Sequence, residues 1–224
     1  MVRGAPMMML DLVWVGRDVP AAVDARFGVT SGIGQALVID PHAGYTIDGL
    51  TVAAELPLVV ASIRQPAGSY LDTSTHGNLV LSGAWRVFPM LAVGIAIAPP
   101  LAGDGAHSTE ALVTANSLTG YARPDAFTDA FAIVPHATFT YTLDCWSFAA
   151  MARVPIVDGD LSALFAVQVG RRLTRGMTLS ISSQVVVPHA HVFERVTLAI
   201  GEHVGLGITS DLADTIALGV DLAY

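Results

Sequence analysis

The chain closes on "TIALGVDLAY" (Thr215–Tyr224), and the order of large and small residues in this stretch indicates its secondary structure. The large residues, all aliphatic or aromatic, occupy every second position: Ile216, Leu218, Val220, Leu222 and Tyr224. The residues between them are small or polar. Successive side chains of a β-strand point to opposite faces, so a period of two predicts a strand. This strand has one apolar face and ends on an aromatic residue.

The same alternation runs through four longer stretches: Leu50–Ser62, Met90–Leu101, Phe131–Leu143 and Met177–Val187. In the second of these, Leu91, Val93, Ile95 and Ile97 alternate with alanine and glycine. No stretch of the chain favours a helix with comparable strength. The chain is therefore predicted to be all-β.

About 12 alternating segments, each of a length suited to a tilted membrane strand, divide the chain. Their expected bounds are 7–15, 21–29, 35–47, 50–62, 77–87, 90–101, 128–143, 146–157, 161–172, 177–188, 193–208 and 215–224. Gly, Pro and Asp occupy the short connections, as turns require. Two connections are longer, Arg64–His76 and Ala102–Phe127, and the second is expected to be a functional or mobile loop. Residues 1–224 are predicted to form a single domain.

The composition leaves two classes of β-protein open. Of the 224 residues, 53% are hydrophobic and 13% are charged, and the mean hydropathy is +0.58; soluble domains carry about 25% charged residues. No uncharged apolar run reaches about 18 residues, so no transmembrane helix is predicted. "MMMLDLVWVG" (Met7–Gly16) contains Asp11 and lacks the cleavage site of a secretory signal. The chain is either a soluble β-protein with a very apolar core or a barrel that turns half of its residues to lipid.

The residues that alternate with the apolar rows separate these two classes. They are mostly Ala, Gly, Ser and Thr, with isolated charges of both signs. Such a face suits the polar interior of a barrel better than the solvated face of a sandwich. The sequence therefore favours a closed antiparallel transmembrane β-barrel of about 12 strands over a soluble β-sandwich or lipocalin-like barrel. Glu202 does not fit, because it shares parity with the apolar residues Leu198 and Ile200.

Charged and histidine side chains of the polar face are predicted to line a constriction in the lumen: Asp24, Arg26, Asp40, His42, Glu55, Arg86, His136, Arg153, Arg195 and Asp221. Barrels of about 8 strands fill with side chains and barrels of about 16–18 strands leave a pore, so an intermediate number predicts a narrow path. Charges at such a path set ion selectivity. The predicted function is a passive channel for small solutes. The alternatives are a plugged barrel with a structural or assembly role and a soluble binding barrel.

Two resemblances give this fold a cellular setting. The aromatic end of "TIALGVDLAY" resembles the last strand of bacterial outer-membrane barrels, which implies an outer-membrane location, contact with membrane lipid and recognition of that strand by the barrel assembly machinery. "YTIDGLTVAAELPLV" (Tyr45–Val59) and "HGNLVLSGAWRV" (His76–Val87) resemble strand–turn–strand units of the porin-like family linked to phenol-degradation pathways. This resemblance implies passage of small hydrophobic or aromatic solutes, and it assigns no residue a role.

Motifs with catalytic or ligand-binding chemistry are few. His189 and His191 in "PHAHVF" are too few ligands for a metal site. Asp40 and His42 could act with Ser180 or Ser182, but no nucleophile motif is present. The three arginines of "GRRLTRG" (Gly170–Gly176) are expected to meet phosphate headgroups or solvent, and the net charge of −8 disfavours nucleic acid. We expect no enzyme activity, no cofactor, no metal and no nucleic-acid partner.

One expectation conflicts with the usual arrangement of such barrels. An even number of strands places both chain ends at the periplasmic side, so the turn Ser210–Asp214 is extracellular. Counting back from this turn puts the long connections Arg64–His76 and Ala102–Phe127 at the periplasmic side. Bacterial barrels carry their long loops outside. Either the strand count is off by one in the first half of the chain, or the topology is unusual.

Overall fold

In the computed structural model, the 16 strands found among the described residues belong to one antiparallel sheet. The structure describes residues 21–30, 34–64, 69–103, 111–113, 125–187, 191–200, 204–211 and 215–223. The strands of the first half are β1 (Ala21–Thr30), β2 (Gly34–Ile47), β3 (Leu50–Glu55), β4 (Leu58–Arg64), β5 (Tyr70–His76), β6 (Val80–Phe88) and β7 (Leu91–Ala98). Those of the second half are β8 (Ala132–Leu143), β9 (Trp146–Arg153), β10 (Ile156–Val157), β11 (Asp160–Leu161), β12 (Ala163–Thr174), β13 (Met177–Val187), β14 (His191–Ile200), β15 (Val204–Asp211) and β16 (Thr215–Ala223). No helix in these ranges is long and apolar enough to cross a membrane.

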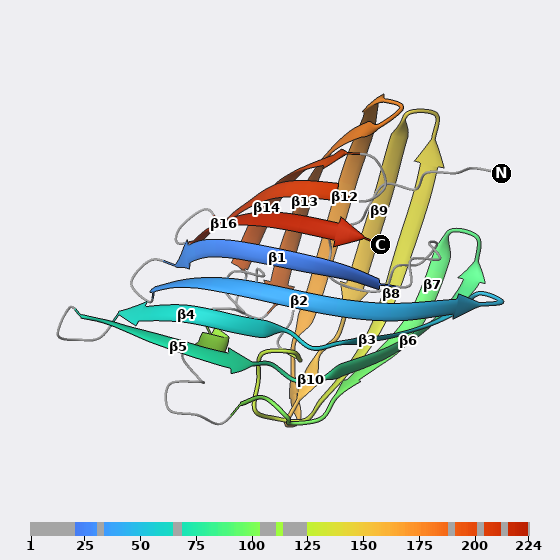
Figure 1. Ribbon diagram of the computed structural model, residues 1–224. Coiled ribbons are helices and arrows are strands. Elements are labelled where there is room, and N and C mark those ends of the chain that lie inside the picture. Colours follow the sequence, from blue (N-terminus) through green and yellow to red (C-terminus); the bar gives the residue numbers. More distant parts are fainter. Residues whose placement is uncertain are drawn as a thin grey trace.

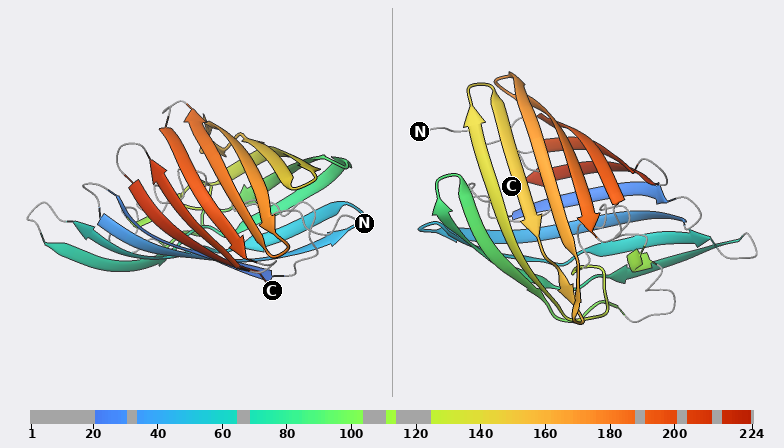
Figure 2. Two further views of the ribbon diagram at one scale, coloured as in Figure 1. Left: turned by 90° about the horizontal axis from the view of Figure 1, so that it is seen from above. Right: turned by 180° about the vertical axis from the view of Figure 1, so that it is seen from behind.

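The hydrogen-bonded pairings wrap the sheet around an interior. β1 pairs with β2 on one edge and with β16 on the other. From β16 the pairings continue through β15, β14, β13, β12, β9, β8, β7, β6 and β3, and β3 pairs again with β2. Figures 1 and 2 show β1, β2 and β4 on one side of this interior and β8, β9 and β12 on the other. The short β10–β11 hairpin is attached to β8.

Two long strands of the wall are interrupted next to each other. The predicted strand 50–62 is divided at Leu56–Pro57 into β3 and β4, because Pro57 has no N–H to donate to a ladder. The adjacent strand is divided at 77–79 into β5 and β6, where the Gly77 N–H donates to the Pro57 carbonyl at 2.8 Å. β5 also corrects the prediction of a long loop before residue 76, since it pairs with β4. Its residues are mostly polar on both faces, and this weakened the strand pattern.

The predicted strand 193–208 is wrong, because this segment contains parts of two strands, β14 and β15. They pair antiparallel from Ile200, opposite Val204. Alternation does not reveal the turn, because Leu206 and Ile208 continue the parity of the apolar residues before it. Glu202, which parity placed on the apolar face, lies outside the described residues, as does the predicted strand 7–15.

The observed strands resolve the conflict over which end of the barrel carries the long connections. Two-residue turns join β2 to β3, β6 to β7, β8 to β9 and β12 to β13, and they lie at one end of the wall, toward the upper right of Figure 1. In the first of these turns Asp48 and Gly49 have φ angles of 48° and 84°, as a tight hairpin requires. The long connections after β4, β7 and β9 follow strands that run to the other end, where β15 also ends and β16 begins. The predicted placement of the long connections opposite that turn is therefore wrong.

The two faces of the wall have the predicted chemistry. The outward face carries large apolar side chains such as Val60, Trp85, Ile95, Phe139 and Val167, each more than 40% exposed. The inward face is buried and consists mainly of Ala, Val, Ser, Thr and Gln. Large apolar residues outside and small or polar residues inside is the reverse of a soluble protein and the pattern of a membrane barrel.

Candidate functional site

The long connection between β7 and β8 packs against the inner wall. Its described parts are 99–103, a helical turn at 111–113, and 125–131, and together we call them the inward segment. We call 99–103 its leaving limb and 125–131 its returning limb. Ala111, Leu112, Ala126 and Phe127 of this segment are buried in one apolar cluster. The wall residues of the cluster come from β2, β4, β6, β7 and β8: Ala36, Val38, Val59, Ala61, Ile63, Val80, Ala96, Ala98, Ala132 and Val134. The inward segment therefore covers an apolar sector of the inner wall.

One side chain ties the two limbs of the inward segment together. Asn78, between β5 and β6, is fully buried. Its Oδ1 accepts hydrogen bonds from the N–H groups of Leu101 and Ala102, each at 2.8 Å. Its Nδ2 donates to the carbonyls of Asp125 at 3.0 Å and Thr128 at 2.8 Å. An asparagine amide has two donors and one two-lone-pair acceptor, so this side chain uses all of its hydrogen-bonding capacity on the segment.

The preceding glycine allows the returning limb to approach the wall. A Cβ at Gly77 would clash with the carbonyl oxygen of Ala126 and lie 2.7 Å from Pro57 Cγ. The N–H of Asn78 donates to the same Ala126 carbonyl at 2.7 Å. Gly77 is thus required by the contact of two backbones.

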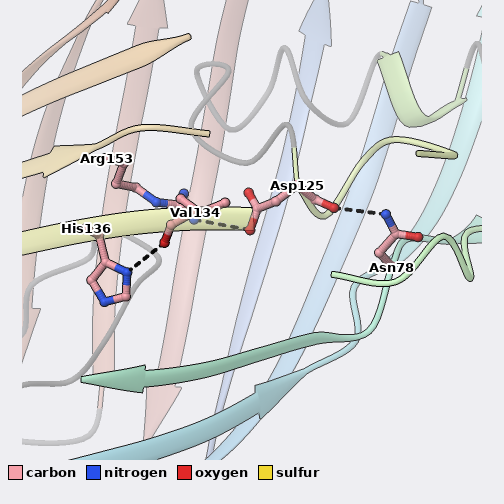
Figure 3. Close-up of polar contacts among 5 residues, drawn as sticks. All are labelled: Asn78, Asp125, Val134, His136 and Arg153. Carbon is pink, nitrogen blue, oxygen red and sulfur yellow. Dashed lines mark hydrogen bonds and ion pairs between the residues drawn. The ribbon is translucent and has the colours of Figure 1, made fainter. Parts of the chain in front are cut away.

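A buried ion pair holds the returning limb from the other side. Arg153 Nη2, at the end of β9, lies 3.1 Å from Asp125 Oδ2, and both side chains are fully buried (Figure 3). Removing one partner of such a pair costs about 3–5 kcal/mol, because the other charge stays buried. The limb is therefore fastened to β9 by Arg153 and to the β5–β6 junction by Asn78.

His136 of β8 lies next to this ion pair. It is opposite Arg153 in the register, and its Nδ1 lies 3.2 Å from the Val134 carbonyl oxygen (Figure 3). Its ring lies over Gly94 of β7, where a Cβ would clash with the imidazole. The predicted site residues His136 and Arg153 thus lie together, and Asp125 completes a polar cluster with them.

The inner wall of β12, β13 and β14 has a different chemistry. Its buried side chains include Gln168, Ser180, Ser182, Gln184 and Thr197, and we call it the polar sector. Gln168 Nε2 donates to Ser180 Oγ at 2.8 Å. Among the side chains that the structure describes, no buried one in this sector is charged. Amides and hydroxyls both donate and accept hydrogen bonds, so this sector is polar although its described buried side chains carry no charge.

The register places three of the predicted constriction residues in one row. Asp24 of β1 is opposite Asp221 of β16 and opposite Asp40 of β2. Residues directly opposite in antiparallel strands share a face, and the Asp40 side chain is buried on the inner face. Arg26 is two residues from Asp24 on the same strand. The side chains of Asp24, Arg26 and Asp221 lie outside the described part of the chain.

The remaining predicted residues are spread over the wall. His42 is opposite Glu55 in the register of β2 and β3, and Arg195 is on β14. The structure does not describe the side chains of His42 and Arg195. Arg86 is exposed beside the turn that follows β6, at the end away from Arg153. The register thus separates an acidic row on β16, β1 and β2 from the Arg153 cluster on β8 and β9.

Sequence reasoning missed Asp125 and did not assign Asn78 to the site. Asn78 carried a usable signal, because it has the parity of the polar face. Asp125 lies in a long connection, where alternation gives no information. Only the path of the inward segment brings its carboxylate to Arg153.

The residues considered for catalysis and for metal binding lie on different parts of the chain. β2, which carries Asp40 and His42, is separated along the sheet from β13, which carries Ser180 and Ser182, by β1, β16, β15 and β14. His189 lies outside the described residues. Among the residues described, no group of three or more His, Cys, Asp or Glu is placed to hold a metal. The absence of enzyme activity, cofactor and metal stays a prediction.

Comparison with solved structures shows the fold. No family model and no curated protein matches the chain. An outer membrane channel from Pseudomonas putida F1 is similar, with a TM-score of 0.64 at 12% identity over 94% of this chain and 98% of that one. The KdgM porin, solved in complex with disordered oligogalacturonate, has a TM-score of 0.57 at 8% identity over 91% of this chain and 99% of that one.

The fold is therefore that of outer-membrane β-barrel proteins, and it is shared with channels and porins. It is not confined to channels: outer membrane phospholipase A from Escherichia coli has a TM-score of 0.51 at 10% identity over 96% of this chain and 95% of that one. At these identities the likeness defines the fold, and the activity must be argued from the residues.

Proposed function

We propose that the chain is a passive channel for small solutes in the bacterial outer membrane. One observation carries the proposal: the pairings return to the strand from which they start, while large apolar side chains face outward and small or polar ones face inward. The strands on this circuit are β1, β16, β15, β14, β13, β12, β9, β8, β7, β6, β3 and β2, which supports a closed barrel of 12 strands.

The outward aromatic residues support a membrane location over a soluble lipocalin-like barrel. Tyr45, Trp85 and Phe88 lie close to the two-residue turns and are 66%, 58% and 61% exposed. Membrane barrels place aromatic girdles at the two water interfaces, whereas a soluble barrel turns such side chains inward. The short turns support a periplasmic position for this end. The C-terminal strand β16 would then be the element that the barrel assembly machinery recognises.

Two separate observations bear on the class of solute. The sequence resemblance favours small hydrophobic or aromatic compounds. The polar sector favours solutes that exchange hydrogen bonds with amides and hydroxyls. A phenol-like solute, with an apolar ring and one hydroxyl, meets both requirements.

The second candidate function is a plugged barrel with a structural role. The observation that favours it is the double attachment of the inward segment, by Asn78 and by the Arg153–Asp125 pair. A segment held so firmly would narrow the path or close it.

Conductance in planar bilayers distinguishes the two candidates. For the channel we expect steady openings of the parent protein, and larger or more variable openings for Asn78→Ala, because both limbs lose their shared anchor. Ser74→Ala, on the outward side of β5, is the control and should behave like the parent. If neither the parent nor Asn78→Ala conducts after correct insertion, the channel proposal is wrong and the plugged barrel replaces it. Uptake of phenol compared with a neutral sugar by liposomes then tests the solute class.

A further inference from the structure

An arginine interrupts an outward apolar row on β12. The outward residues along this strand, all exposed, are Phe165, Val167, Val169, Arg171 and Leu173. The cross-strand neighbours of Arg171 are Trp146 of β9 and Leu179 of β13, which are also exposed. Arg171 therefore has an apolar side chain on each of its four sides within the outward face, near the end with the two-residue turns.

The Arg171 guanidinium has few interactions with other groups of the protein. Its Cζ lies 5.3 Å from the centre of the Trp146 ring, which is a cation–π contact. Among the described residues, none pairs a carboxylate with the Arg171 guanidinium or accepts a hydrogen bond from it. The next residue differs, because Arg172 Nη2 donates to the carbonyl oxygen of Asp144 at 3.2 Å. Arg171 thus keeps its charge and its five N–H donors for a group outside the chain.

We propose that Arg171 and Trp146 bind the phosphate of a phospholipid headgroup in the leaflet at the end with the short turns. A guanidinium binds phosphate through two parallel charge-assisted hydrogen bonds. The indole has an apolar ring and one N–H, so it suits the boundary between acyl chains and headgroups. This inference rests on the proposed membrane location.

The surroundings of Arg171 identify a lipid rather than a free phosphate ion as the ligand. Val169, Leu173, Trp146 and Leu179 would contact acyl chains, and only an amphipathic molecule brings acyl chains and phosphate to one place. Arg175 is exposed in the turn that follows β12 and adds a second positive charge. The two charges favour an anionic headgroup, such as that of phosphatidylglycerol.

The test follows the unfolding temperature of the full chain in non-ionic detergent micelles. The micelles are titrated with phosphatidylglycerol, with a phosphate-free galactosyl diacylglycerol, or with inorganic phosphate. Phosphatidylglycerol is expected to stabilise the parent, and its half-saturating amount should rise about tenfold in Arg171→Gln, because the charge-assisted pair is lost. Arg171→Lys should lie between the two, since lysine keeps the charge but not the planar fork.

Arg86→Gln is the matched control, because Arg86 is an exposed arginine at the same end of the wall. It should titrate like the parent. The site is refuted if Arg171→Gln responds to phosphatidylglycerol like the parent, if the galactolipid stabilises equally, or if inorganic phosphate reproduces the shift. Insertion into bilayers is measured separately: a protein that inserts into no bilayer contradicts the proposed function, whereas one that inserts but shows no Arg171-dependent shift contradicts this site alone.

Discussion

The apolar sector and the polar sector of the inner wall differ in what lies against them. On β2, β4, β6, β7 and the first half of β8 the wall residues of the apolar cluster are alanine and valine with one isoleucine, and the inward segment packs on them. On β12, β13 and β14 the inward residues include glutamine, serine and threonine. Apolar inward residues lie where the chain covers its own wall. The difference shows that the inward residues of a strand indicate whether the inward segment packs against that strand.

The largest effect is expected from breaking the ion pair that fastens the inward segment. Arg153→Met leaves the Asp125 carboxylate buried without its partner and should lower the free energy of unfolding by about 3–5 kcal/mol. Urea unfolding in lipid vesicles, followed by heat-modifiable gel mobility, measures this loss. The control is Arg153→Met combined with Asp125→Leu, which removes both charges and should recover most of the stability. Equal losses in the single and the double variant would show that the pair does not hold the segment.

A smaller loss of stability is expected when a charge is placed on the outward face of β12, and a still smaller one when it is placed on the inward face. Val167→Arg places a charge on the outward face of β12, at a cost of about 2–4 kcal/mol if that face meets hydrocarbon. Gln168→Arg changes the next residue, which points inward among serines, and should cost less. The folded fraction of both variants in vesicles gives the comparison. A larger loss for Gln168→Arg would reverse the faces and favour a soluble barrel.

The two faces could be predicted from the sequence because alternation is local information. Val167 and Gln168 are adjacent, and the period of two places them on opposite faces without any knowledge of the fold. The same rule failed at Leu206 and Ile208, because the apolar parity of β14 continues across the turn into β15. It also failed at Tyr70–His76, where both faces of β5 are mostly polar. Alternation therefore locates strands well and their ends poorly.

The site was less predictable, because it depends on contacts between distant parts of the chain. Arg153 and His136 could be chosen from their parity, but their partner Asp125 lies in a connection without a pattern. Asn78 contacts residues on both sides of a segment that begins more than twenty positions later in the sequence. The row formed by Asp24, Asp40 and Asp221 likewise follows from strand pairing, which alternation alone does not determine.

The smallest change in stability is expected from removing either of two hydroxyls, which differ in whether they have a hydrogen-bond partner. Ser180 Oγ accepts a hydrogen bond from Gln168 in the polar sector. Ser180→Ala should therefore lower the free energy of unfolding by about 0.5–1.5 kcal/mol. Thr138 Oγ1, on β8 between Ala92 and Met151, is buried and has no hydrogen-bond partner among the described residues.

Thr138→Val exchanges this hydroxyl for a methyl group of similar shape, and it removes a buried polar atom that the described residues leave unsatisfied. The variant should be as stable as the parent or more stable by up to about 1 kcal/mol. Urea unfolding of both variants under the same conditions decides the sign. If Thr138→Val is destabilised as much as Ser180→Ala, its hydroxyl makes a contact of equal value. The second half of β8 would then belong to the polar sector, and the boundary between the two sectors would lie between Val134 and Thr138.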